Sequence, residues 1–465
     1  MKKGKFMQHS DWVRSAEEAL YAHWPELLRD LKQLIRIEST RGEAAPGTPF
    51  GQGPAAALEY MLSRAGEMGL NIQNWDGYVG TADYGPQEPG LDILTHLDVV
   101  PAGENWKISQ PFEPRQVGNR LYGRGAADNK GPTIAVLYAL LAVRQCGAAL
   151  QRRVRLIWGC SEETGAEDIR VYYAAVPPAR MTVTPDAAFP VINSEKGRME
   201  CRFEKKIPPD CPVRFLSGGG AANAVPDSAQ AVLAADPAQI RVILSTLQAG
   251  QCSLEVGSDG LCCLKAHGTA AHAASPSKGC NALSILLGVI AACPGAPDWA
   301  GSLAGLFPPQ GAIRQVNEEE TVTASLSAMK LENGRLTGVC EKRYPPTACA
   351  EDERDALVQS LEKIGFTVEV SGFSQAHCVP ADSHFVRTLL ECYRDAGGEN
   401  ACCCAIAGNT YAHSIPGAVA FGFAHPVIRT GTHGADEYVD LEQLRFGARV
   451  YIRAIIELCC GGTPD

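Results

Sequence analysis

The sequence predicts an α/β protein: a mostly parallel sheet with helices on both faces, interrupted by an α+β lid domain. Over residues 1–195, short apolar runs of strand length alternate with helical patterns, which is typical of a parallel sheet covered on both sides. From about residue 196 the strand-like runs are separated by turn signals instead, and the α/β pattern returns near residue 378. We therefore expect one domain made of 1–195 and 378–465, and a second domain at 196–377.

Helical patterns and strand-like runs follow one another in the first domain. In segment 11–36, Leu27, Leu31 and Leu34 recur at helical spacing, and the last segment repeats apolar residues at i, i+4 steps. Each expected strand is a near-continuous apolar run, as suits a strand that is buried on both faces. The expected helices are 11–36, 53–68, 131–145, 383–396 and 442–459, and the expected strands are 91–100, 153–163, 181–187 and 418–424.

The second domain has the pattern of antiparallel strands with helices between them. Turn signals such as Ser258-Asp259-Gly260 and Glu332-Asn333-Gly334 interrupt its strand-like runs. Helical stretches are expected at 236–248 and 281–292. This mixture predicts the α+β lid domain.

Composition excludes several classes of function. Acidic residues outnumber basic ones by 52 to 42, for a formal net charge of -10, which argues against binding to nucleic acid or to an anionic membrane. No apolar run approaches the ~20 residues of a membrane-spanning helix, and polar residues follow the basic start where a signal peptide would be apolar. The 18 cysteines include no CxxC pair, so we expect reduced thiols in a cytoplasmic protein.

Histidine and acidic residues follow the ends of the expected strands, where the ligand sites of open parallel sheets gather. His96 and Asp98 close the run that begins at Leu91, and strand alternation puts both on one face. A metal-bound histidine commonly donates its other N–H to an acceptor, a role for which Asp98 is placed. Glu162 and Glu163 end the next run, and such adjacent carboxylates are costly unless they are solvated or neutralised by cations.

Three further positions belong with these. Asp128 lies in a glycine-bracketed turn before a helix, and Asp186 follows the strand-like residues 181–184 and Pro185. His433 lies in a glycine-rich loop before the last helix. Asp128, the glutamate pair and His433 each have a purely structural alternative. Asp128 could be a helix cap, or equally a carboxylate held in a tight turn to bridge two cations. The glutamate pair could lie in a solvated loop, and a single loop histidine could simply lie at the surface.

Taken together, five of these residues form a set with a defined chemistry. Two imidazoles and three carboxylates, without a thiolate, can hold two divalent cations that share one bridging carboxylate. Nitrogen and oxygen ligands suit zinc, and also cobalt or manganese. One of the adjacent glutamates can ligate while its neighbour stays free as a general base. The set is His96, Asp128, Glu163, Asp186 and His433.

At this point the sequence resembles a known family, the metallopeptidases of carboxypeptidase G, aminoacylase and succinyl-diaminopimelate desuccinylase, and within it the dipeptidase V-like members. The resemblance extends over nearly the whole chain and implies an α/β catalytic domain with a dinuclear metal centre, plus a lid domain. The motifs that carry it include HLDVVPAGENW, YGRGAADNKGP, CSEETG, TPDAAFPVINSEKG, NAVPDSA, AHAASPSKGCNA, RYP and HGADEY.

The resemblance implies roles for single residues of the first domain. It makes the five residues of the set metal ligands, with Asp128 bridging. It assigns Asp98 to orienting the histidine and Glu162 to the general base. It also places Gly408 at the substrate, in a stretch where the family has a second glycine and this chain has Asn409. A side chain there narrows or re-aims the pocket.

The resemblance also implies three roles in the lid domain. His272 would stabilise the oxyanion of the tetrahedral intermediate, as preorganised donors do. Asn223 would contact the substrate. Arg343 would hold the terminal carboxylate of the substrate through paired hydrogen bonds.

We therefore expect a metallodipeptidase that cleaves short peptides with a free C-terminal carboxylate, a broad range of dipeptides that extends to Xaa-His or β-alanyl dipeptides. It would use two divalent cations, Zn²⁺ above all, with Mn²⁺ or Co²⁺ as substitutes. Two alternatives stay open: an N-acyl amino acid amidohydrolase with the same centre, and a catalytically inactive binding protein. A small peptide substrate is the expected partner, without nucleic acid or membrane. The long insert favours a monomer, with a homodimer as the alternative.

Overall fold

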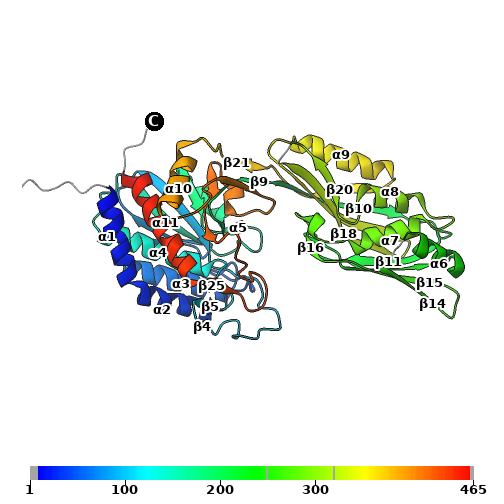
Figure 1. Cartoon of the computed structure of the whole chain (residues 1–465), viewed down its shortest axis with the longest axis horizontal. Coiled ribbons are helices and arrows are strands. Elements are labelled where there is room, and N and C mark those ends of the chain that lie inside the picture. The colour runs from blue at the N-terminus through cyan, green and yellow to red at the C-terminus, as the bar shows by residue number, and fades with distance from the viewer. Residues whose placement is uncertain (1–8, 248–249, 318–319, 461–465) are drawn as a thin grey trace, which may run out of the picture. The chain divides into compact units, whose positions relative to one another are not determined.

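The computed structural model describes residues 9–247, 250–317 and 320–460. The chain forms two compact units, which Figure 1 shows with the blue and red ends of the chain in unit 1 and the green and yellow middle in unit 2. Unit 1 comprises Met1–Ser194, Cys378–Ala405 and Asn409–Asp465, and unit 2 comprises Glu195–His377 and Ile406–Gly408.

Residues 406–408 belong to unit 2, whereas the sequence placed them in the first domain. Two hydrogen bonds explain this. Lys196 N donates to Ile406 O at 3.0 Å, and Arg343 Nη1 donates to Ala407 O at 2.9 Å. A short return segment is therefore attached to unit 2 by its main chain, which no local sequence pattern reveals.

Unit 1 is built on a sheet whose central strands run parallel, which confirms the predicted α/β class. Parallel pairs join β6 to β3, β3 to β7 and β7 to β23, while β1, β2 and β9 pair antiparallel. The order is β1 (Asn71–Trp75), β2 (Val79–Tyr84), β6 (Arg153–Gly159), β3 (Pro89–His96), β7 (Met181–Thr184), β23 (Ala418–Ala420), β9 (Val191–Glu195) and β21 (His377–Cys378), and β22 (Cys403–Ile406) also pairs with β9.

Side chains alternate across this sheet, so each strand feeds two cores. On β3, Ile93 packs into the larger core and Leu94 into the smaller one, and on β6 Leu156 and Ile157 do the same. Helices α1 (His9–Ala22), α2 (Trp24–Arg36) and α11 (Leu441–Cys460) each contact α4 (Lys130–Gln145) over the larger core, as Figure 1 shows. Helix α5 packs into the smaller core. Both faces of the sheet are covered.

The helices of unit 1 fall near the expected ranges with two exceptions: the first segment is divided, and α5 was not expected. Segment 11–36 was expected as one helix but forms two, which meet at His23. The second helix has Pro25 in its first turn, and proline has no N–H to continue the helical ladder. The helices are α1 (His9–Ala22), α2 (Trp24–Arg36), α3 (Gln52–Glu67), α4 (Lys130–Gln145), α5 (Glu167–Ala175), α10 (His384–Asp395) and α11 (Leu441–Cys460).

Two small sheets in unit 1 join segments that are far apart in sequence. In one of them β25 (Tyr438–Asp440) pairs antiparallel with β5 (Arg120–Tyr122), with Tyr438 opposite Tyr122. Strand β4 (Arg115–Val117) continues this sheet. In the other, β8 (Ala187–Ala188) pairs parallel with β24 (Phe423–Ala424). The first sheet brings the loop before β25 beside the turn that follows β5.

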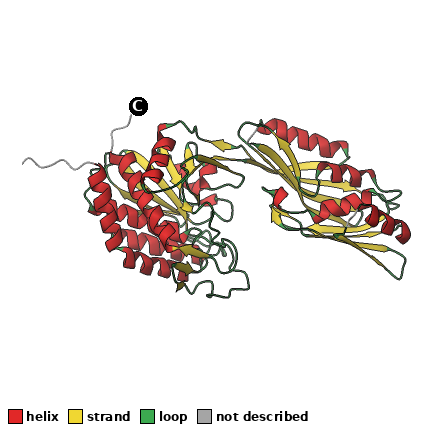
Figure 2. Ribbon diagram, viewed as in Figure 1, coloured by secondary structure: helices red, strands yellow, loops and turns green. Residues whose placement is uncertain are grey.

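Unit 2 contains an antiparallel sheet and four helices that share one apolar core, visible in Figure 2 as yellow strands flanked by red helices. At the predicted turn between β18 and β19, Asn333 and Gly334 both have positive φ, which matches the twist of a two-residue hairpin. The order is β14 (Cys252–Val256), β15 (Cys262–His267), β13 (Ser228–Leu233), β11 (Val213–Gly219), β18 (Thr321–Glu332), β19 (Arg335–Tyr344), β10 (Gly197–Lys206) and β20 (Thr367–Ser374), and β17 (Ala312–Gln315) pairs with β18.

The helices of unit 2 are α6 (Pro237–Thr246), α7 (Ala282–Ala291), α8 (Asp298–Leu306) and α9 (Ala350–Lys363). The expected helix at 236–248 ends in a residue that lies outside the described part of the chain, and α8 and α9 were not expected. A pair of two-residue strands, β12 (Ala224–Val225) and β16 (Ala271–His272), forms a separate sheet.

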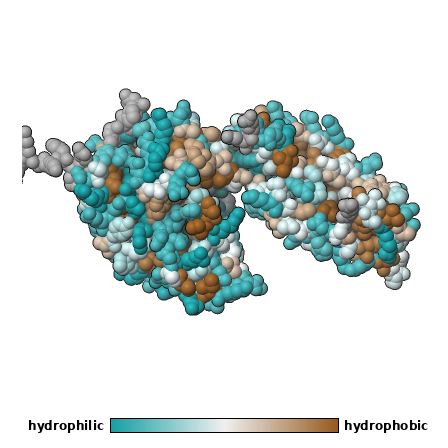
Figure 3. All heavy atoms as spheres, in the orientation of Figure 1, coloured by the Kyte–Doolittle hydropathy of each residue, from teal (hydrophilic) through white to brown (hydrophobic). Residues whose placement is uncertain are grey.

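The surface and the thiols agree with the composition. On the face shown in Figure 3, hydrophilic residues predominate and hydrophobic ones lie between them. Over the described residues, no helix has both the length and the apolar character needed to cross a membrane. All 18 cysteines are free thiols, and ten of them are buried in the two units.

Candidate metal centre

The carboxyl ends of neighbouring parallel strands deliver the central residues. His96 is the last residue of β3, Glu162 and Glu163 follow β6, and Asp186 follows β7. Since β6, β3 and β7 are adjacent and parallel, these side chains emerge at one edge of the sheet. Asp128 joins them from the turn between β5 and α4.

His96 is fully buried and fixed in orientation. Its Nδ1 lies 3.0 Å from the main-chain oxygen of Asp98 and 3.5 Å from the Asp98 carboxylate. The closer contact is thus made by the carbonyl, where the sequence favoured the carboxylate. If Nδ1 donates, Nε2 carries the lone pair and faces two carboxylates. Nε2 lies 3.0 Å from Asp128 Oδ1 and 3.6 Å from Asp186 Oδ1.

The Asp98 carboxylate instead holds the turn that carries the two glutamates. Its Oδ1 accepts from the N–H of Glu162 and its Oδ2 from the N–H of Glu163, both at 3.1 Å. This pair of hydrogen bonds fixes the main chain under both carboxylates. Over the described residues, the Glu162 side chain makes no hydrogen bond or ion pair with protein.

Asp128 lies between the two imidazoles. Its Oδ1 is 3.0 Å from His96 Nε2, and its Oδ2 is 3.1 Å from His433 Nε2. His433 Nε2 is also 3.0 Å from Glu163 Oε1. Two groups of ligand atoms result, each compact enough for one ion, and Asp128 is the residue they share. All five residues of the predicted set are therefore brought together.

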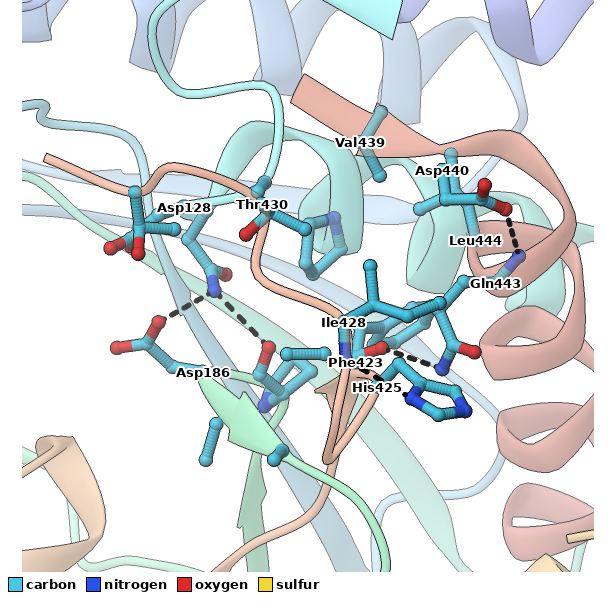
Figure 4. Close-up of a pocket in the computed structure, with 18 residues that line it drawn as sticks. Asp128, Asp186, Phe423, His425, Ile428, Thr430, Val439, Asp440, Gln443 and Leu444 are labelled. Atoms are coloured by element: carbon cyan, nitrogen blue, oxygen red, sulfur yellow. Dashed lines mark hydrogen bonds between the residues drawn. The ribbon is translucent and has the colours of Figure 1, made fainter. Parts of the chain in front are cut away.

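A cavity of about 240 Å³ adjoins this cluster and is shown in Figure 4, with Asp128 and Asp186 at its edge. Asn129 Nδ2 donates to Asp186 Oδ1 at 2.8 Å and so fixes that carboxylate. Most of the cavity wall is apolar, with Phe423, Ile428 and Leu444 among its residues.

The charges of the cluster are poorly balanced without cations. Burial, followed by the negative charge of Asp186, raises the pKa of Glu162 well above its ordinary range. Burial and the charge of Asp128 raise the pKa of Asp186. Hydrogen bonds to Asp128 and Glu163 raise the pKa of His433 to about 10. Carboxylates crowded in this way are stabilised by bound cations, so the donor set fits divalent metal ions.

Two predicted lid residues meet in unit 2. Ala224 of β12 lies opposite His272 of β16, and Asn223 O accepts from Ala273 N at 2.8 Å. His272 Nδ1 accepts from Ala274 N at 3.0 Å, so the neutral ring carries its proton on Nε2. His272 thus lies on this small sheet and Asn223 immediately before its first strand, and both residues are exposed.

Arg343 and Gly408 also lie in unit 2. Arg343 is buried on β19, and its Nε donates to Glu341 Oε1 at 2.9 Å. Its Nη1 bonds the main-chain oxygen of Ala407, the residue before Gly408. The substrate roles of these four lid-unit residues remain predictions.

Sequence reasoning missed two buried side chains that hold the segments carrying the candidate ligands, Asp168 and Glu437. Asp168 accepts hydrogen bonds from Cys160 N at 2.6 Å, Ser161 N at 2.8 Å and the Tyr411 hydroxyl at 2.5 Å. Glu437 accepts from the turn that carries Asp128. The available signal was weak, because Asp168 resembles an ordinary acid in the first turn of a helix and Glu437 an ordinary loop acid.

Comparisons with known proteins agree with this geometry. The profile of Peptidase family M20/M25/M40 matches residues 93–457. The chain is 32% identical over 459 residues to YtjP of Bacillus subtilis strain 168, described as a candidate dipeptidase, covering 93% of this chain and 97% of that one.

Solved structures share the fold at low identity. Human carnosine dipeptidase 1 superposes with a TM-score of 0.61 at 15% identity, over 96% of this chain and 98% of that one. Aminoacylhistidine dipeptidase from Vibrio alginolyticus gives 0.59 at 14% identity, over 93% and 96%. The matched profile spans most of the chain and includes all five clustered residues. The chain therefore belongs to peptidase family M20/M25/M40 and is a metal-dependent hydrolase of peptide bonds.

Proposed function

We propose that this peptidase is a dipeptidase with two divalent cations, Zn²⁺ in the first place, held by side chains of unit 1. One observation carries the proposal: Asp128 turns one carboxylate oxygen to His96 and the other to His433. A carboxylate in this position can bridge two ions.

The donor atoms divide evenly between the two ions. Asp186 joins His96 and one oxygen of Asp128, while Glu163 joins His433 and the other oxygen. Each ion then has one nitrogen ligand and two carboxylate oxygens, a set that suits zinc and that manganese or cobalt can also occupy. Asp98 fixes the His96 ring through its carbonyl and so keeps Nε2 available as the ligand.

When bound, two such cations polarise the scissile carbonyl and lower the pKa of water. Glu162 accepts a proton from the attacking water and returns it to the leaving amine, because its carboxylate has no protein partner and its main chain is fixed by Asp98. His272 Nε2–H donates to the developing oxyanion. Arg343, with Asn223 and Gly408 beside the substrate, holds the terminal carboxylate.

The substrates we propose are dipeptides with a free carboxylate, including Xaa-His and β-alanyl dipeptides. The dipeptidase names of the similar proteins support this choice. The alternative is an N-acyl amino acid amidohydrolase, which would use the same metal chemistry on a substrate without a free amino group. Side-by-side kinetics on dipeptides and N-acetyl amino acids distinguish the two.

The test compares wild type with Glu162→Gln on a dipeptide panel, with and without a chelator. We expect hydrolysis that stops with chelator and returns with zinc, and a kcat that falls about 10²–10⁴-fold in Glu162→Gln. Glu167→Gln is the matched control, a nearby acid with a half-exposed side chain that pairs with Arg41. Dipeptide hydrolysis that is indifferent to chelator, or equal in wild type and Glu162→Gln, contradicts the proposal.

A further inference from the structure

Glu437 is a buried carboxylate that is not among the proposed ligands, yet it contacts the turn that carries one of them. It lies in the loop that also carries His433 and is 1% exposed. Its Oε1 accepts from the N–H of Ala127 at 3.0 Å and of Asp128 at 3.2 Å. Its Oε2 accepts from the N–H of Gly125 at 3.1 Å. Three amides of one turn therefore converge on one carboxylate.

The charge of Glu437 is neutralised by Arg124, which is equally buried. Arg124 Nη1 donates to Glu437 Oε2 at 2.6 Å, and its Nη2 donates to Ala102 O at 3.1 Å. The guanidinium also lies over the Trp106 ring, 5.4 Å from its centroid. A buried ion pair is tolerated when its remaining hydrogen-bonding groups are satisfied, as these largely are.

The main chain closes the same arrangement from the other side. Gly123 N donates to Glu437 O at 3.0 Å, and the next residue, Tyr438, lies opposite Tyr122 in the pairing of β25 with β5. The turn is thus wrapped around Glu437 between a strand pair and the start of α4. A change in this carboxylate would release the amide of Asp128 itself.

We propose that Glu437 is a positioning residue, which fixes Asp128 between His96 and His433 before any cation binds. Charge-assisted hydrogen bonds to main-chain N–H groups are stronger than neutral ones, and three of them leave the turn one conformation. The inference rests on the proposed function, because it presupposes that Asp128 bridges two ions. Its consequence is a preformed site with high metal affinity.

The variant Glu437→Gln tests this role. Glutamine keeps the shape of the side chain, but its amide nitrogen, Nε2, can only donate. It therefore replaces one carboxylate oxygen that accepts hydrogen bonds, and the N–H donors to that oxygen lose their partner. We expect the zinc affinity of the metal-free protein, measured by competition with a chromophoric chelator, to fall about 10–100-fold. This readout needs no catalytic activity.

Asp30→Asn is the matched control for the loss of a buried ion pair. Asp30 is buried in the helical layer, where it accepts from Arg64 Nε at 2.8 Å and from the Tyr138 hydroxyl at 2.7 Å. This variant is expected to unfold at a lower temperature yet to bind zinc as wild type does. Equal zinc affinities in wild type and Glu437→Gln overturn the positioning role, and so does an equal loss of affinity in both variants.

Hydrogen exchange of the wild-type protein gives a second test that does not depend on the variant folding. With chelator present, the amides of Ala127 and Asp128 are expected to be as protected as with zinc. Exchange that stays fast until zinc is added overturns the inference. Wild-type protein that binds no zinc contradicts the proposed function as well, whereas normal wild-type binding with an unaffected Glu437→Gln contradicts only the role of Glu437.

Discussion

Asp168 shows how one buried residue fixes the main chain near a proposed reacting group, the carboxylate of Glu162, with which it shares no hydrogen bond. It holds the amides of Cys160 and Ser161, and Asp98 holds the next two, so four successive N–H groups are bound by two carboxylates. The turn that carries Glu162 and Glu163 is therefore fixed from both sides. The Tyr411 hydroxyl donates to the same Asp168 oxygen.

Asp168→Asn is expected to lower the kcat of dipeptide hydrolysis by about tenfold or more, since small displacements of a reacting group are costly. Both carboxylate oxygens of Asp168 accept hydrogen bonds, since the second oxygen accepts from the Ile169 N–H. The side-chain amide of asparagine has only one accepting oxygen, so one set of these bonds is lost. Asp92→Asn is the control, a buried carboxylate on β3 that accepts from Ala179 N. If steady-state kinetics show an equal loss of kcat in both variants, the positioning of Glu162 is not the cause.

The sequence predicted the residues that cluster at the candidate metal centre but not the residues that support them, for a physical reason. His96, Glu163 and Asp186 could be found because each follows an apolar run that forms a parallel strand. Asp168 and Glu437 stabilise main-chain N–H groups of distant segments, and nothing local distinguishes such an acid from a solvated one. The carbonyl contact of His96 likewise depends on the path of the chain after the strand.

At the scale of elements, apolar patterns predicted the buried central strands and missed elements that are exposed, such as β1, or short, such as α5 and α8. Strand β1 is almost wholly exposed and polar, so no apolar run indicates it. Pro25 indicates the break between the first two helices, but the helical spacing of apolar residues continues across this break and so predicted a single helix. Helix α4 is buried over nearly its whole length, and its expected range was close.

A buried carboxylate on β3, Asp92, accepts a hydrogen bond from the segment before β7, and its burial predicts a pH effect on stability. Burial raises the pKa of Asp92 from 3.8 to about 6, although Ala179 N donates to it. The folded state therefore binds this proton more tightly than the unfolded chain, and the free energy of unfolding falls as pH rises from about 4 to 6. At 1.36 kcal/mol per unit, the change is up to about 3 kcal/mol.

Asp92→Asn should remove this dependence and be the more stable protein at pH 7. Urea unfolding of both proteins between pH 4 and 7 checks it. Tryptophan fluorescence is a suitable probe, because five of the six tryptophans belong to unit 1. Parallel pH profiles for wild type and variant would rule the effect out.

At the scale of the whole chain, two units with separate cores divide the predicted roles. Unit 1 supplies every proposed metal ligand and the proposed base, while the predicted substrate contacts lie in unit 2. The α+β class of the insert was predicted from its turn signals. The roles of His272, Asn223 and Arg343 came from family resemblance, because no spacing in the sequence indicates them.

Anomalous X-ray diffraction at the zinc edge, from crystals of the zinc-loaded protein, tests the dinuclear centre most directly. We expect two peaks about 3.5–4 Å apart, one ligated by His96 and Asp186, the other by His433 and Glu163, with Asp128 bound to both. A single peak, or a pair that Asp128 does not bridge, would contradict the account.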